Sequence, residues 1–90
     1  PTVPTRLLAQ NNPNPFNPST LISYTVPAKG YVTLKVYNVN GQEVATLFEG
    51  ESPAGTFNFT FNANGLSSGV YFYRLTGSGF DETRKMVLLK

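Results

Sequence analysis

Alternation of apolar and polar residues is the main pattern along this chain. Short runs rich in Val, Thr, Tyr and Phe are separated by clusters of Gly, Pro and Asn, which is typical of strands joined by turns. No segment shows the apolar repeat of an amphipathic helix. The pattern predicts strands at residues 6–10, 20–26, 31–39, 42–48, 56–61, 70–76 and 83–89.

The faces of these strands indicate where a core lies. Within 31–39, one face carries Val32, Leu34 and Val36, and within 56–61 one face carries three Phe residues. These two faces, one on each strand, are predicted to be buried in the core. About seven strands without a helix indicate an all-β fold, an immunoglobulin-like antiparallel β-sandwich, although the Cys and Trp of antibody domains are absent. The predicted core Phe residues are Phe57, Phe59 and Phe61.

Three local motifs predict how the chain turns. Asn40-Gly41 favours a type I′ hairpin, because both residue types tolerate positive φ. The prolines around Asn14-Pro15-Phe16 predict a rigid loop. Gly69 suits a bend before Tyr71, whose hydroxyl is expected either to bond backbone, as in a tyrosine corner, or to lie on a plain alternating strand.

Length and charge limit the function further. Ninety residues make one domain, which buries only about 60% of its unfolded surface, and without Cys the 40% hydrophobic content must form the core unaided. A net charge of +2 is too small for a nucleic-acid surface, and no apolar run reaches the ~20 residues of a membrane span. We expect a monomer, in which residues 1–5 are a linker from an upstream domain and residues 6–90 are the domain itself.

Candidate chemistry is sparse. The absence of His and Cys excludes Ser-His-Asp and Cys-His catalysis and zinc sites built on those ligands. The carboxylates lack the apolar neighbours that would tune them for acid–base work, and Asp81-Glu82 lacks the spacing of a calcium loop. We therefore predict no catalytic residues, no metal and no cofactor. The carboxylates are Glu43, Glu49, Glu51, Asp81 and Glu82.

The aromatic residues leave a second function open. A flat ring matches the apolar face of a pyranose, so a carbohydrate-binding module is an alternative, as is a structural accessory module of a multidomain secreted enzyme. Tyr31, Tyr37 and Tyr73 are the expected exposed candidates for such a platform.

Three segments in order carry a family resemblance: 10–20 (QNNPNPFNPST), 36–44 (VYNVNGQEV) and 66–75 (LSSGVYFYRL). With the basic-then-apolar terminus they resemble the type A C-terminal sorting domain of type IX secretion, which is related to the immunoglobulin-like domain of a flagellar hook-capping protein. The resemblance implies a non-catalytic secretion signal attached to an upstream cargo domain. It also implies transit through the periplasm, then a location at the cell surface or outside the cell.

The same resemblance implies partners and a recognition segment. The partners are the outer-membrane type IX translocon and a sortase-like peptidase that cleaves in or just before residues 1–5. The recognition segment is the last strand, whose edge a receptor would extend by β-augmentation, with Lys85 and Lys90 as polar anchors. A fully paired structural strand is the alternative. The residues expected to contact the translocon are Lys85, Met86, Val87, Leu88, Leu89 and Lys90.

Overall fold

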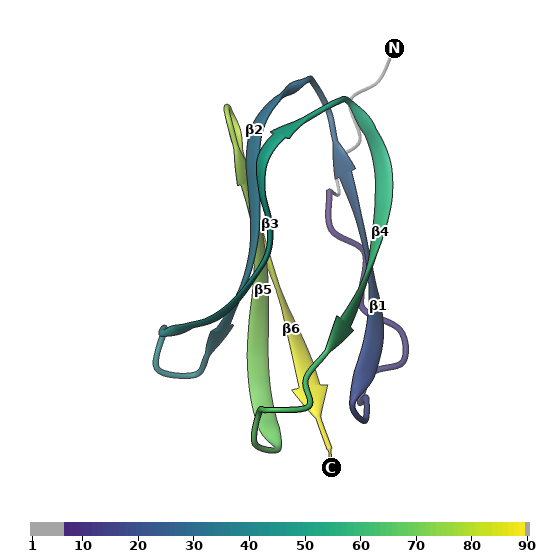
Figure 1. The fold of residues 1–90 in the computed structure, drawn as a ribbon, viewed down its shortest axis with the longest axis vertical. Coiled ribbons are helices and arrows are strands. Elements are labelled where there is room, and N and C mark those ends of the chain that lie inside the picture. Colours follow the sequence, from purple (N-terminus) through teal and green to yellow (C-terminus); the bar gives the residue numbers. More distant parts are fainter. Residues whose placement is uncertain (1–6, 90) are drawn as a thin grey trace.

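A computed structural model describes residues 7–89, and within them the chain forms six strands in two antiparallel sheets. One sheet pairs β1 with β4, and the other has the order β3-β2-β5-β6. Figure 1 shows the two sheets facing each other as the layers of a sandwich. This confirms the predicted all-β, immunoglobulin-like sandwich. The strands are β1 (Ser19–Val26), β2 (Gly30–Asn38), β3 (Glu43–Ser52), β4 (Gly55–Asn62), β5 (Gly69–Gly77) and β6 (Phe80–Leu88).

The predicted first strand, 6–10, is not a regular strand. Arg6 lies outside the described residues, and the segment that follows lies along β1 through isolated bridges, Leu8 with Tyr24 and Asn12 with Leu21. Its amides are shared between the two sheets: Ala9 N–H donates to Ser23 O, whereas Leu7 N–H donates to a carboxylate of β6. A ladder with β1 alone therefore does not form.

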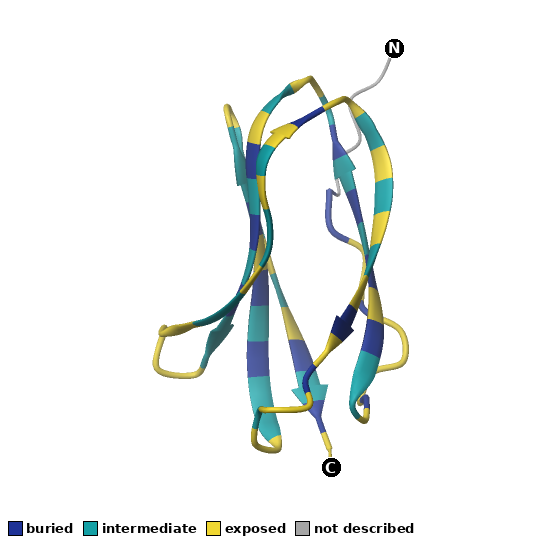
Figure 2. Cartoon of the chain, viewed as in Figure 1, coloured by how far each residue is buried: buried dark blue, intermediate teal, exposed yellow. Residues whose placement is uncertain are grey.

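Apolar residues of the strands alternate into a single core. Figure 2 shows buried and more exposed positions following one another along β1, β2 and β5. The face of Val32, Leu34 and Val36 is buried as predicted, each residue being at most 1% exposed. The other strands and loops add Leu7, Leu8, Phe16, Ile22, Tyr24, Val26, Phe61, Ala63, Tyr71, Tyr73, Leu75, Met86 and Leu88.

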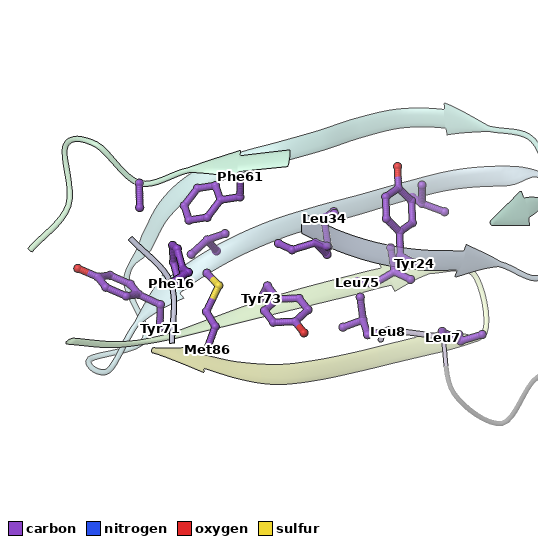
Figure 3. Close-up of a cluster of buried hydrophobic side chains, with 14 of the residues drawn as sticks. Leu7, Leu8, Phe16, Tyr24, Leu34, Phe61, Tyr71, Tyr73, Leu75 and Met86 are labelled. Carbon is purple, nitrogen blue, oxygen red and sulfur yellow. The ribbon is translucent and has the colours of Figure 1, made fainter. Parts of the chain in front are cut away.

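The Phe row of β4 faces the core, but not evenly. Phe61 is 4% exposed, and its ring lies 6.2 Å from that of Phe16, as Figure 3 shows between the sheets. Phe57 and Phe59 are only half-buried, although they pack against the core. The expectation of a fully buried row was wrong for these two residues, because no other described segment pairs with the outer edge of β4, whereas Leu8 and Asn12 bridge to the outer edge of β1.

The loop expected between 49 and 55 is shorter than predicted. β3 continues to Ser52, which pairs with Gly30 at the start of β2, so that only Pro53 and Ala54 separate β3 from β4. Polar residues of an edge strand join a ladder as readily as apolar ones when their neighbour supplies the partners. The alternation of side chains therefore underestimated the length of β3.

The β2–β3 turn differs in type from the prediction. Gly41 has φ +82°, but no non-glycine described residue has positive φ, so Asn40 does not adopt the conformation that a type I′ turn needs. Gly41 N–H donates to Asn38 O, which closes a type I turn followed by a left-handed glycine. The Asn38 side chain accepts the amides of Asn40 and Gln42, and this favours the extra residue in the loop.

Tyr71 closes a tyrosine corner. Its hydroxyl donates to Ser67 O at 2.7 Å, across the bend that enters β5 at Gly69, where φ is +153°. The ring is 7% exposed and lies at one end of the core (Figure 3). Of the two alternatives left by the sequence, the corner is the one observed.

Candidate recognition surface at the terminal strand

The side chains of the predicted recognition segment divide between core and solvent. Met86 and Leu88 are fully buried, because the inner face of β6 packs into the sandwich. Lys85 is exposed and Leu89 is 55% exposed, with Val87 half-buried between them. Lys90 lies outside the described residues. Of the described residues in this segment, therefore, only the alternate residues Lys85, Val87 and Leu89 offer side-chain surface to a partner.

The outer backbone edge of this segment is already bonded. Val87 N–H donates to Asn14 Oδ1, and Val87 O accepts the amide of Phe16. Leu89 N–H donates to Phe16 O, and Lys85 O accepts from the side-chain amide of Gln10. The expected free edge for β-augmentation is wrong for this stretch, because the proline-rich loop occupies it.

The proline-rich loop is itself held by a buried polar cluster. Asn11 and Thr20 are each 2% exposed, and Asn11 Nδ2 donates to Thr20 Oγ1 at 3.0 Å and to Pro13 O at 3.1 Å. Thr20 Oγ1 in turn donates to Pro13 O at 2.9 Å. This cluster fixes the loop so that Asn14 and Phe16 meet β6, which gives the segment 10–20 a structural reason for its composition.

Three side chains of the four-stranded sheet bind the backbone of residues 7–11, the entry segment of the described chain. Glu82 accepts the amides of Leu7 and Leu8 through its two carboxylate oxygens, both at 2.9 Å, and Arg84 Nε donates to Leu8 O at 2.8 Å. Tyr73 is fully buried; its hydroxyl donates to Ala9 O at 2.6 Å and accepts the amide of Asn11 at 2.9 Å. Burial raises the pKa of the Tyr73 hydroxyl.

Tyr73 was therefore wrong as an exposed sugar-stacking candidate. Its alternation with Tyr71 and Leu75, both buried, was the available indication that it faces the core. Tyr31 is 55% exposed, in agreement with the expectation, and Tyr37 is half-buried.

The outer face of the four-stranded sheet carries a feature that the sequence reasoning missed. Arg74 of β5 donates to Asp81 of β6 through Nε at 2.8 Å and through a second, shorter bond. The bond from Arg74 holds the pKa of Asp81 below its usual value, and Asp81 raises that of Arg74. The register of the β5–β6 hairpin would have been needed to bring these two residues together.

A second ion pair lies nearby on the same face. Lys35 Nζ is 3.1 Å from Glu43 Oε1. Hydrogen bonds from Thr46 and Lys35 lower the pKa of Glu43, and the bond to Glu43 raises the pKa of Lys35. The Arg74–Asp81 pair is exposed and the Lys35–Glu43 pair is partly exposed, so water screens both and they contribute little to stability.

Among residues 7–89 no group of three or more acidic, His or Cys side chains converges as a metal site would require. In that same part of the chain, no helix is long and apolar enough to cross a membrane.

The two packed sheets and the tyrosine corner define an immunoglobulin-like all-β module. A family model described as the secretion system C-terminal sorting domain matches residues 12–89. The chain belongs to this family and is a type IX secretion sorting domain, part of a protein secreted toward the cell surface or beyond. No curated protein and no solved structure matches the chain.

Proposed function

We propose that this domain is a non-catalytic label that carries an upstream cargo domain through the type IX translocon, by way of the periplasm, to the cell surface. The family match over residues 12–89 is the observation that carries the proposal. The anchoring of the chain entry supports it, because Glu82, Arg84 and Tyr73 bind the residues next to a linker. These bonds would keep the domain folded while a cargo domain is attached upstream of residue 7.

We place translocon recognition on the outer side chains of the terminal segment. Since the backbone edge is bonded to the loop, the partner contacts Lys85, Val87 and Leu89, with Lys90 as the second charged anchor. Met86 and Leu88 support the segment from the core. The sortase-like peptidase acts upstream of Leu7, in or before residues 1–5, because residues from Leu7 onward are bonded into the sandwich.

The test is secretion of a reporter that carries an N-terminal export signal and this domain at its C-terminus. Deleting 85–90 is uninformative about recognition, because it removes two fully buried side chains. The informative variant is Lys85→Ala with Lys90→Ala, and the matched control is Lys29→Ala, an exposed lysine in the β1–β2 turn.

We expect the double variant to accumulate in the periplasm with unchanged thermal stability, and the Lys29→Ala control to reach the surface. Normal secretion of the double variant would remove the lysines from the recognition site. Loss of secretion in the Lys29→Ala control would show that total charge matters rather than position.

A further inference from the structure

A shallow hollow of about 370 Å³ lies on the outer face of the four-stranded sheet, away from the covered edge of β6. Its floor comes from β2, β5 and β6, where Tyr37 lies opposite Phe72 and Arg74 lies opposite Thr83. The β2–β3 turn forms a wall through Val39 and Gly41. The hollow thus combines an aromatic end, a polar end and a loop wall.

The polar end carries no net charge. Arg74 and Asp81 form a two-bond pair, so one cation and one anion cancel within the lining. The neighbouring Lys35–Glu43 pair, on residues opposite Arg74 and Tyr37 in the ladders, is closed in the same way. Such a surface offers fixed donors and acceptors without favouring a phosphate or a cationic ligand.

The aromatic end offers flat apolar surface. Tyr37 and Phe72 are cross-strand partners and both are half-buried, so each ring keeps part of its area open to solvent. Val39 is 66% exposed beside them. An occupant therefore needs an apolar face about as wide as a ring.

The wall is preformed. Asn38 Oδ1 accepts the amides of Asn40 and Gln42, and Asn38 Nδ2 donates to Gln42 Oε1 at 3.0 Å. These bonds hold the turn in one conformation, which lowers the conformational-entropy cost of binding a ligand there.

We propose that this hollow binds a neutral hexopyranose unit of a glycan. The apolar face of the sugar stacks on Tyr37 and Phe72, and neighbouring hydroxyls exchange hydrogen bonds with the Arg74–Asp81 pair. A neutral ring with one apolar face and a polar rim is the ligand class that matches both ends. No described residue of 85–90 lines the hollow, although Lys85 lies opposite Phe72 in the β5–β6 ladder.

The test is a titration of the isotope-labelled chain with the methyl glycosides of glucose, mannose, galactose and N-acetylglucosamine, followed by amide chemical shifts. At least one glycoside is expected to give saturable shifts centred on Tyr37, Phe72, Arg74 and Asp81. Tyr37→Ala should weaken the binding about tenfold, as loss of an aromatic contact implies. Asp81→Asn should weaken it by at least a similar factor, since a charged acceptor is lost.

Tyr31→Ala is the matched control, because Tyr31 is on the same strand and exposed but does not line the hollow. It should leave the affinity unchanged. Absence of saturable shifts with all four glycosides would overturn the proposal. So would shifts that persist unchanged in Tyr37→Ala while that variant keeps the spectrum of a folded domain.

Discussion

Removal of one hydroxyl group, in Tyr73→Phe, tests how the entry segment is held. The hydroxyl donates to Ala9 O and accepts the amide of Asn11, at 2.6 and 2.9 Å. Asn11 is 2% exposed, so its amide would be left without a partner and without ready access to water. Ala9 is exposed, and its carbonyl can be hydrated.

The expected loss follows from this asymmetry. A buried donor left unsatisfied costs about 1–3 kcal/mol, and the hydrated carbonyl adds only a fraction of a normal hydrogen bond. We therefore expect Tyr73→Phe to lower the free energy of unfolding by about 2–3 kcal/mol, a large share for a domain of this size.

Tyr71→Phe is the matched control. It also removes one phenolic hydroxyl, but the carbonyl it releases belongs to the exposed Ser67, so about 1 kcal/mol is expected. Urea unfolding with a common m-value would compare the two variants. If Tyr73→Phe costs no more than Tyr71→Phe, the entry segment is not anchored in the way described.

Three further variants test the core, the turn and the titration of Tyr73. Phe61→Ala should lower the free energy of unfolding by about 3–5 kcal/mol and Phe59→Ala by roughly half as much, because Phe59 is only half-buried; equal losses in calorimetry would contradict the uneven row. Gly41→Val should lower the free energy of unfolding by about 1–3 kcal/mol, because Gly41 has positive φ and a Cβ there would meet open space. Gly30→Val, where a Cβ also meets open space but φ is not positive, should be nearly neutral in the same thermal melts. Equal losses in the two variants would exclude backbone strain as the cause. Burial raises the pKa of Tyr73 in the folded state, so the stability that its neutral hydroxyl contributes is complete below about pH 10 and is lost as pH rises through the folded pKa. Tyr73→Phe should therefore lose less stability at alkaline pH than the unmodified chain. An identical alkaline profile of the two proteins would contradict the titration of Tyr73 as the cause.

The sequence predicted the regular parts of the fold well. Alternation placed Val32, Leu34 and Val36 in the core, because β2 has neighbours on both sides and one face buried along its length. It was less informative for β3 and β4, whose outer edges pair with no other described segment, unlike those of β1 and β6. There, burial depends on how far the opposite layer extends, and a strand's own side chains do not encode that distance.

The hydrogen bonds that cover the terminal strand were beyond local reasoning. Asn14 and Val87 are 73 residues apart, and Leu7 and Glu82 are 75 apart. A carboxylate near a turn looks solvated in the sequence, whereas Glu82 accepts two backbone amides from the other end of the chain. A free edge was expected for the terminal strand because the pattern of strands predicts how they pair within a sheet. The same pattern does not predict that a loop will cover the edge of the last strand.

The surface location of a reporter tests the central claim most directly. The same fusion of an export signal, a reporter and residues 1–90 would be expressed in type IX-competent cells and in otherwise identical cells without the translocon. Protease accessibility of the reporter on intact cells would be measured in both. We predict an accessible reporter in the competent cells and a protected, periplasmic reporter in the others. Equal accessibility in the two strains, or protection in both, would contradict the assignment as a sorting signal.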